Sequence, residues 1–468
     1  MPMNPQPEDQ PFDGRWWWPG DADLVVGGRL FRDGGFWHLA LLGWLGPYSS
    51  ADSELDVPDV LHGQVGTTPF TLLDLVYQGS TRGGQERPYR TSIIANRVLA
   101  GAHVFADTRF NSASVRLANL NEWANRRPWE FSFDRVDDRR EESVAFSEPP
   151  PLTAQLPGAG VQLWRNWGRS GGGLSDVKLS SSEIIHFDLE TPRSLEEVEH
   201  EWVRPFRHLL ELAASARCPV IELTLTLERD SNYPDLVTVF SAVGDQHSEV
   251  KQSFFFLFTL EEVDFSEVVE AWWELHSDLG IVPDLVAELR KSDRHGGALF
   301  LTAASAVEGY HRHRNRRRKA TPDHKRRLAG ILDSAPVADR EWLREKLRFS
   351  HEPTFADRIS EVVLYAGPMF ADLVGDLESW IQWVKNSRNS VAHRDPKMNR
   401  PEDDWKTTIW VTESIRWLMT LVLLNELGVP ADIVEGGVRR ERGLAGTRRA
   451  LQSVQPRWYG ISPTGQSS

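Results

Sequence analysis

Short apolar runs separated by polar and glycine-rich breaks fill the first part of the chain. Residues 23–31 and 36–45 each have the pattern of a strand, and Gly34-Gly35 between them predicts a hairpin turn. Similar runs follow at residues 70–77, 92–105 and 114–123. The pattern predicts a β-rich, sandwich-like domain over residues 12–150.

The middle of the chain mixes helical and strand patterns. Ser194 and Glu197 have the spacing of a capping box, which predicts a helix that begins there and continues to about residue 216. Residues 220–227 alternate apolar residues with Thr and Glu, as a strand does, and residues 252–259 contain three consecutive Phe, which predicts a buried strand. We interpret residues 151–296 as a mixed α/β continuation of the N-terminal region.

Helical patterns dominate from residue 261 onward. Residues 261–289 carry nine acidic residues and no Lys or Arg, and they predict two helices with a solvated acidic face, broken near Gly280 and Pro283. Further helices are predicted at about residues 298–318, 339–350, 356–376, 378–394 and 405–427. Residues 297–430 are therefore expected to form an all-α bundle. Residues 431–468 form a basic tail, and its part from Gly436, with six Arg residues, is expected to be loosely ordered. The predicted fold class is α+β with several domains.

Composition narrows the class of protein. The 468 residues have a formal net charge of −14, which argues against a protein that coats nucleic acid by charge alone. Cys218 is the only cysteine, which excludes a disulfide framework and a cysteine-rich metal site. The first residues lack the pattern of a signal peptide, and no apolar run is long enough to span a bilayer. We expect a cytoplasmic protein with no membrane contact, whose nineteen Trp residues mostly anchor cores.

The stretch from Arg388 to His393 carries the strongest chemical signal. An Arg can hold phosphate oxygens, and a His can move a proton near neutral pH. Spacing alone is weak evidence, because the chain contains eight pairs in which His follows Arg by five to seven residues. This pair differs because polar Asn389 follows the Arg directly and because the run closes a long helix just before Asp395-Pro396. We therefore treat Arg388, Asn389 and His393 as candidate catalytic residues. The alternative is an ordinary helix end, in which Arg388 pairs with an Asp or Glu and His393 caps a carbonyl.

Such residues suit the cleavage of RNA, which supplies its own 2′-hydroxyl nucleophile. The reaction needs a base for that hydroxyl, an acid for the leaving 5′-oxygen and a cation for the charged transition state; His and Arg can provide these without a metal. On a helix Asn389 and His393 share a face, whereas Arg388 points roughly 140° away from His393. One chain offers a single His in this motif, so we predict that two chains dock through this region as a homodimer or a higher homo-oligomer.

A basic segment lies earlier in the same region. Residues 311–327 contain nine Lys or Arg and one Asp, a composition that suits binding of a phosphate backbone. The alternative is a solvated helix end. His311 and His313 diverge on a helix, so we expect no metal and no cofactor. The candidate RNA-binding residues are Arg312, Arg314, Arg316, Arg317, Arg318 and Lys319.

Glu308 precedes this segment in an otherwise apolar helix. Its carboxylate can reach Arg388 and orient it, or it can form an ordinary i,i+4 pair with Arg312. The first alternative adds Glu308 to the candidate catalytic residues.

These residues have the form of a known motif. Arg388-Asn389 followed by His393 in a C-terminal helical bundle resembles the HEPN superfamily, whose motif is Arg, a polar residue, a few further residues and His. The arrangement of the whole chain resembles ApeA-like proteins of bacterial antiphage defence, through Gly27-Gly28-Arg29-Leu30-Phe31, Thr71-Leu72-Leu73, Leu120-Asn121-Glu122-Trp123-Ala124-Asn125 and the HEPN-like end.

The resemblance implies a metal-independent endoribonuclease that acts as a dimer, with Arg388 and His393 catalytic and Asn389 supporting. It also implies abortive infection, in which host RNA, commonly tRNA, is cut after a phage-derived trigger acts through the N-terminal region. Some HEPN domains are not nucleases, so a non-catalytic module that binds nucleic acid or a partner is one alternative. A second alternative is a ligand-binding β-domain on a helical dimerisation scaffold.

Overall fold

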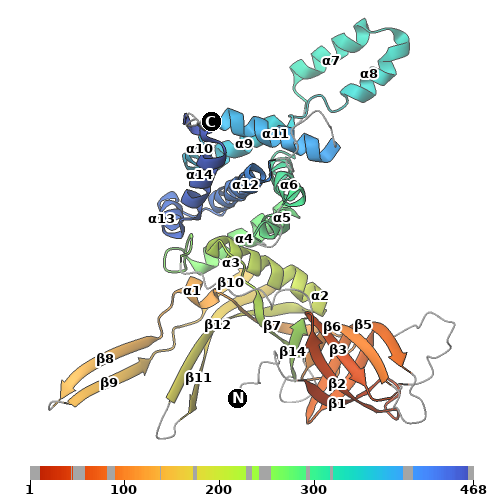
Figure 1. The fold of residues 1–468 in the computed structure, drawn as a ribbon, viewed down its shortest axis with the longest axis vertical. Coiled ribbons are helices and arrows are strands. Elements are labelled where there is room, and N and C mark those ends of the chain that lie inside the picture. The colour runs from red at the N-terminus through yellow and green to blue at the C-terminus, as the bar shows by residue number, and fades with distance from the viewer. Residues whose placement is uncertain are drawn as a thin grey trace, which may run out of the picture. The chain divides into compact units, whose positions relative to one another are not determined.

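The computed structural model describes residues 11–43, 45, 58–81, 90–136, 139–171, 177–227, 235–241, 255–290, 296–316, 320–393 and 404–461 (Figure 1). The chain divides into two compact units. Unit 1 comprises residues 1–210, 218–253 and 264–270, and unit 2 comprises residues 211–217, 254–263 and 271–468. The fold class is confirmed, because unit 1 is rich in β-structure and unit 2 is mostly helical.

Six strands of unit 1 close into an antiparallel barrel with the order β6-β3-β2-β1-β4-β5, in which β5 pairs with β6. The predicted hairpin is confirmed, because β2 and β3 are joined by Gly34 and Gly35, both with positive φ (57° and 87°). Trp16 fills the interior, and Gly63 leaves room for its ring: a Cβ at residue 63 would lie 2.2 Å from a ring carbon. The strands are β1 (Phe12–Trp17), β2 (Val26–Asp33), β3 (Phe36–Leu41), β4 (Val60–Val65), β5 (Thr68–Thr81) and β6 (Arg90–Ala100).

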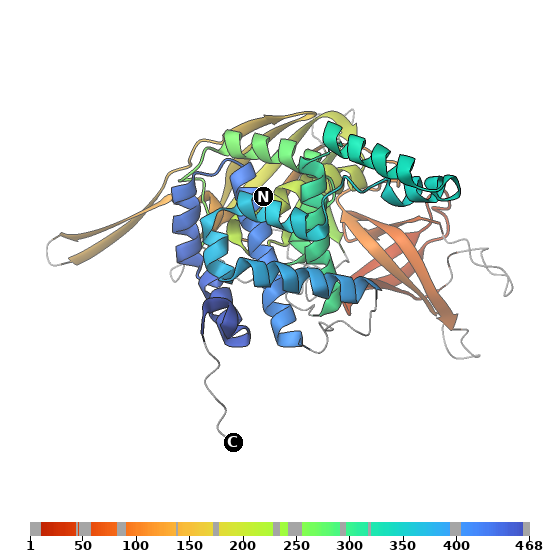
Figure 2. The same ribbon diagram turned by 90° about the horizontal axis from the view of Figure 1, so that it is seen from above.

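The sheet continues beyond the barrel from β6 through six more described strands, in the order β14, β13, β7, β12, β11, β10. This sheet combines strands that precede residue 150 in the sequence with strands that follow it. Two further strands, β8 (Trp129–Val136) and β9 (Arg139–Phe146), form a separate antiparallel ribbon that extends as an arm in both views (Figures 1 and 2). The additional elements are β7 (Phe110–Leu117), α1 (Leu120–Ala124), β10 (Leu152–Leu156), β11 (Ala159–Gly171), β12 (Val177–Arg193), β13 (Val220–Leu227) and β14 (Asp235–Ser241).

The capping box at Ser194 is confirmed, since its side chain and that of Glu197 each bond the other's backbone N–H. The helix that starts there runs as α2 (Leu195–Val198), a π-helical segment η1 (Glu199–Val203) and α3 (Arg204–Ala214). The acidic segment forms two helices as predicted, α4 (Phe265–Leu279) and α5 (Val282–Glu288), separated at Gly280 with φ +57°.

The strand predicted at residues 252–259 is wrong for the part that the structure describes. Residues 255–259 form no strand, although Phe256, Leu257 and Phe258 are buried. The backbone N–H of Leu257 donates to the carbonyl of Ala213 at 2.8 Å, so this segment packs as an irregular buried turn. Burial explains the apolar run, because a short apolar run does not distinguish a strand from other buried chain.

Unit 2 is built around α12, whose side chains are buried on most sides. Buried hydroxyl groups of this helix donate to carbonyls of the preceding turn, as Thr412 does to Thr408 at 2.7 Å and Ser414 does to Val411 at 2.7 Å. The hairpin of α7 and α8 projects from the other helices of this unit (Figure 1). The helices are α6 (Gly297–Arg314), α7 (Pro322–Ser334), α8 (Arg340–Leu347), α9 (Phe355–Ala366), α10 (Pro368–Val374), α11 (Leu377–His393), α12 (Trp405–Glu426), α13 (Ala431–Glu441) and α14 (Gly443–Val454), with short 3₁₀ turns at Val337–Asp339 and Pro456–Tyr459.

Three features of unit 2 differ from the sequence analysis. The helix α7 was not predicted, although Thr321 caps it and Pro322 occupies its first position. The helix expected at residues 356–376 is divided at Gly367, with φ +77°. The expectation of a loosely ordered tail is wrong, because α13 and α14 bury apolar side chains; these are Val434, Val438, Leu444 and Leu451.

Within the described residues, none of the helices combines the length and the apolar character that crossing a bilayer requires.

Candidate functional site

The C-terminal end of α11 carries the predicted motif, and the start of that helix fixes its position. The carboxylate of Asp376 accepts hydrogen bonds from the hydroxyl and backbone N–H of Ser379 at 2.7 and 3.2 Å, which lower the pKa of Asp376. Trp380 is fully buried and donates from Nε1 to Oγ of Ser414 on α12 at 3.0 Å. These contacts anchor α11 on the central helix of unit 2.

The helix α6 packs against α11 and supplies the carboxylate of the site. The rings of Phe300 and Trp383 meet edge to face with centroids 5.9 Å apart. Near the end of α11, a Cβ placed on Gly297 would lie 3.8 Å from the methyl carbons of Val391. This packing holds Glu308, farther along α6, within reach of Arg388.

Glu308 contacts both cations that the sequence analysis proposed for it. Its Oε1 lies 2.9 Å from Nη2 of Arg312, and its Oε2 lies 3.4 Å from Nη2 of Arg388. Glu308 therefore forms both of the expected ion pairs, one with Arg388 and one with Arg312. The Glu308 side chain is 21% exposed, so its carboxylate is largely screened from water and holds the two guanidinium groups close together.

Arg388 is fixed on two further sides. Its guanidinium carbon lies 5.5 Å from the ring centroid of Phe355, at the start of α9, and its Nη1 donates to Oδ1 of Asn389 at 3.5 Å. The side chain is 31% exposed, so N–H donors remain available to a ligand. Sequence reasoning missed Phe355, because the contact joins residues 33 positions apart and has no local pattern.

His393 is the last residue of α11, and its side chain lies outside the described residues. Its backbone lies at the C-terminal end of the helix. Asn389 is four residues earlier, so its Cα lies on the same helix face as that of His393.

The three described Arg among the candidate RNA-binding residues each have an acidic partner. Arg312 pairs with Glu308, Arg314 with Glu426 at 3.1 Å and Arg316 with Asp278 at 3.1 Å. These side chains are 61%, 49% and 55% exposed, so the pairs add little to stability and their guanidinium groups still face solvent. The remaining candidates lie outside the described residues; these are Arg317, Arg318 and Lys319.

Glu426 also anchors the inner side of this segment. The hydroxyl of Tyr310 donates to Oε1 of Glu426 at 2.5 Å, and burial, together with this bond, raises the pKa of Tyr310. The guanidinium of Arg314 lies 5.8 Å from the ring centroid of Tyr365. Arg314 is thus held by an ion pair and an aromatic ring.

No group of three or more His, Cys, Asp or Glu that could hold a metal occurs among the described residues. His311 is buried and its Nε2 lies 2.9 Å from Oε2 of Glu361, so this His contributes to packing between α6 and α9.

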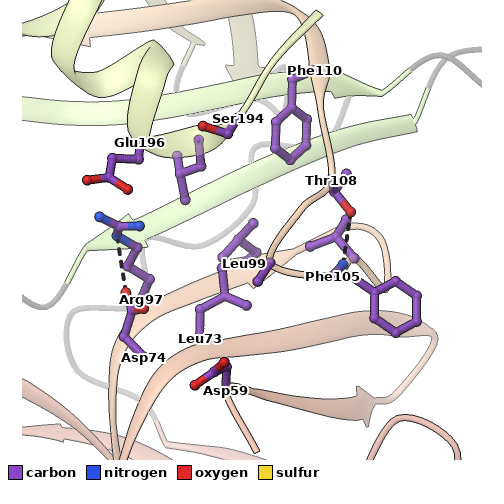
Figure 3. A pocket seen from close by; sticks show the side chains of 13 residues that line it. Asp59, Leu73, Asp74, Arg97, Leu99, Phe105, Thr108, Phe110, Ser194 and Glu196 are labelled. Carbon is purple, nitrogen blue, oxygen red and sulfur yellow. Dashed lines mark hydrogen bonds and ion pairs between the residues drawn. The ribbon is translucent and has the colours of Figure 1, made fainter.

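Unit 1 has a cavity of about 310 Å³ between the barrel and the start of α2 (Figure 3). Arg97 lies at its wall, with Nε 3.5 Å from Oδ2 of Asp74 and Nη2 3.5 Å from Oε2 of Glu199. Figure 3 shows Glu196 facing Arg97 across the opening. None of the predicted site residues lines this cavity.

Comparison with protein families gives two matches that together cover most of the chain. Residues 11–272 match the family described as ApeA N-terminal domain 1. Residues 301–433 match the family described as Apea-like HEPN, and this range contains Glu308, Arg388, Asn389 and His393. Neither a curated protein nor a solved structure matches the chain.

Proposed function

The chain belongs to the ApeA family, in which ApeA N-terminal domain 1 is followed here by an Apea-like HEPN domain, and we propose that it is a metal-independent endoribonuclease of antiphage defence. One observation carries this proposal. The guanidinium of Arg388 is held by Glu308 and Phe355 at the end of α11, five residues before His393. A catalytic cation needs this kind of fixed position, because stabilisation of the transition state depends on donors that are oriented in advance.

In the proposed reaction the ribose 2′-oxygen attacks phosphorus and the bond from phosphorus to the 5′-oxygen breaks. A neutral His393 accepts the 2′-hydroxyl proton, and a protonated His393 of a second copy gives a proton to the leaving 5′-oxygen. Arg388 stabilises the charge on the phosphoryl oxygens, and Asn389 supports it. The products are a 2′,3′-cyclic phosphate and a 5′-hydroxyl. Glu308 is a positioning residue, since it acts through Arg388.

The reaction needs one imidazole as base and another as acid, and each chain supplies one His in this motif, so the proposed enzyme is a homodimer. Two copies related by a two-fold axis bring two His and two Arg to a shared site. A mixture of wild-type and His393→Ala chains tests this arrangement, because a heterodimer retains one imidazole and lacks either the base or the acid. Cleavage that falls as the square of the fraction of wild-type chains supports a shared site. Cleavage that stays proportional to the fraction of wild-type chains, although the subunits exchange, contradicts it.

The basic segment serves as the substrate surface in this proposal. Phosphate groups can replace the carboxylate partners of Arg312, Arg314 and Arg316, because those pairs are exposed. The substrate is host RNA, including tRNA, and unit 1 responds to a phage-derived trigger.

A non-catalytic binding module is the second candidate, and one observation favours it. The three described candidates Arg312, Arg314 and Arg316, and Arg388 itself, already have a carboxylate within 4 Å, as in an ordinary set of structural ion pairs. A module of this kind would bind nucleic acid or a partner and leave RNA intact.

Expression in cells separates the two candidates. We expect the wild type to arrest growth and to generate new RNA fragments that begin with a 5′-hydroxyl, and we expect His393→Ala to do neither. The matched control is His351→Ala, because Arg344 and His351 form another pair with similar spacing in unit 2. Wild-type cells that grow like His393→Ala cells, with the same RNA ends, would support the binding module.

A further inference from the structure

A second hollow lies in unit 1, between α1 and the base of the β8–β9 ribbon, and unlike the first it is lined by three Arg residues. Its volume is about 290 Å³. Three guanidinium groups, two aromatic rings and several amide or hydroxyl groups face it. Its lining consists of Asn121, Asn125, Arg126, Arg127, Pro128, Trp129, Phe131, Arg165 and Ser181.

Two of these Arg residues share one buried carboxylate. Glu183 is fully buried, and its Oε2 accepts from Nη2 of Arg126 at 2.5 Å while its Oε1 accepts from Nε of Arg165 at 2.8 Å. Arg165 is 5% exposed and Arg126 is 13% exposed. Two guanidinium groups against one carboxylate leave one positive charge in excess in a region with little water, which favours an anion at the open side.

The positive charge is available at the rim of the hollow. Arg127 is exposed and has no hydrogen bond or ion pair with any residue that the structure describes. The hydrogen bonds of Arg165 come from its Nε and Nη2, which leaves Nη1 for a ligand. Both groups can therefore donate to the oxygens of one phosphate.

The aromatic residues continue from the hollow along one face of β8. Trp129 and Phe131 lie two residues apart in a strand, so they share a face, and the ring of Phe131 is 64% exposed. Trp129 packs on Phe146 of β9 with centroids 4.9 Å apart, which fixes its ring. The opposite face of the ribbon is polar, with the hydroxyls of Ser132 and Ser143 2.8 Å apart. An exposed ring beside the exposed guanidinium of Arg127 suits the stacking of a base next to its phosphate.

We propose that this hollow binds single-stranded nucleic acid, with one phosphate held by Arg127 and Arg165 and one base stacked on Phe131. The side chains of Asn121 and Ser181 lie at the hollow and can bond the sugar or the base edge. The bound nucleic-acid strand continues along the aromatic face toward Phe133. Glu142 is the cross-strand partner of Phe133, and its negative charge limits favourable contact to the base of the ribbon. The site lies within unit 1 and is separate from the residues proposed to cleave RNA.

The test uses the full chain and a single-stranded DNA decanucleotide that contains 5-iodouracil. This probe lacks the 2′-hydroxyl, so the proposed nuclease cannot cut it and the result does not depend on RNA cleavage. Binding is measured by fluorescence anisotropy, and photo-crosslinking followed by peptide mapping identifies the contact. We expect adducts on the peptide that contains Phe131. We also expect a loss of those adducts, with affinity about tenfold weaker at this site, in Arg127→Glu and in Phe131→Ser.

Two matched variants control for charge and for loss of an exposed ring. Arg15→Glu changes an exposed Arg on β1, and Phe36→Ser changes an exposed Phe on β3; neither residue lines the hollow. Both should crosslink like the wild type. The proposal is overturned if the Phe131 peptide carries no adduct, or if Arg127→Glu retains as much adduct as Arg15→Glu. It is also overturned if a mononucleotide displaces the probe at the same concentration as an unlabelled decanucleotide, because the site would then bind a free nucleotide rather than a strand.

Discussion

Oε2 of Glu308 lies 3.4 Å from Nη2 of Arg388, while Oε1 of the same carboxylate lies 2.9 Å from Nη2 of Arg312. One carboxylate therefore connects the proposed catalytic cation with the first Arg of the basic segment. In the proposed function, a phosphate that binds Arg312 competes with the Glu308 carboxylate for that guanidinium, which leaves the carboxylate to Arg388. Glu308 then couples substrate binding to the position of Arg388.

Glu308→Gln is expected to reduce RNA cleavage about tenfold while the melting temperature changes little. The amide keeps the shape of the side chain but loses the charge that orients Arg388, and a partly exposed ion pair contributes at most about 1 kcal/mol to stability. Single-turnover cleavage rates and a thermal melt check both parts. The matched control is Glu341→Gln, which removes the ion pair between Glu341 and Arg344 on α8. Equal rates for the two variants would show that Glu308 has no role in positioning Arg388.

Charge reversal in the basic segment is expected to weaken RNA binding together with its salt dependence. Replacement of Arg316, Arg317 and Arg318 by Glu removes up to three phosphate contacts, and each lost contact lowers the slope of log affinity against log salt by about 0.7 for a single strand. Titrations at several salt concentrations measure this slope. Arg344→Glu, on the exposed α8, is the control for a change in net charge. A slope that stays at the wild-type value would show that this segment does not contact the RNA.

Glu183→Gln is expected to destabilise unit 1 by about 3–5 kcal/mol, because it leaves Arg126 and Arg165 without their shared buried carboxylate. Urea denaturation of the full chain provides the measurement, with Glu130→Gln on the exposed part of β8 as the control. If both variants unfold at the wild-type urea concentration, the carboxylate is not needed to balance the two guanidinium groups.

Unit 1 is expected to lose stability as the pH falls below about 6.5. Burial lowers the pKa of His62, whose Nε2 donates to the carbonyl of Val104 at 2.9 Å, and burial lowers the pKa of His186 as well. The unfolded chain therefore binds protons in this range that the folded chain does not, so the free energy of unfolding decreases until the pH reaches the folded pKa values.

The measurement is the urea midpoint of the full chain at pH 7.5 and pH 5.5. His62→Gln removes one of the two groups, so its midpoint should fall less than that of the wild type. Ser92→Ala, at a barrel residue on β6, changes no titratable group and should leave the wild-type dependence unchanged. An identical fall in all three proteins would mean that burial of His62 does not contribute.

The sequence predicted those parts of the fold that depend on local chemistry. Gly34-Gly35 marked the hairpin, and Ser194 with Glu197 marked a helix start, because turn and cap geometry involve only neighbouring residues. Closure of the barrel by β5 and β6 depends on pairing between segments whose patterns resemble those of any other strands.

The errors have similar physical causes. The apolar pattern of Val434 and Val438 in α13 was obscured by Gly and Arg residues, so the helices of the tail were missed. At the site, the sequence left Glu308 between two partners and gave no sign of Phe355, because both contacts of Arg388 join different helices. Spacing within one helix predicted the motif of Arg388, Asn389 and His393. Spacing could not predict the contacts that Arg388 makes with residues of other helices.

Cleavage of total RNA in the presence of EDTA tests the central claim most directly. The purified wild type should cut RNA, and Arg388→Ala and His393→Ala should each be slower by about 100-fold or more while keeping their melting temperatures. Arg344→Ala and His351→Ala, from the similarly spaced pair, should cut at the wild-type rate. Cleavage that persists in both Arg388→Ala and His393→Ala, or a wild type that leaves RNA intact as a dimer, would contradict the account.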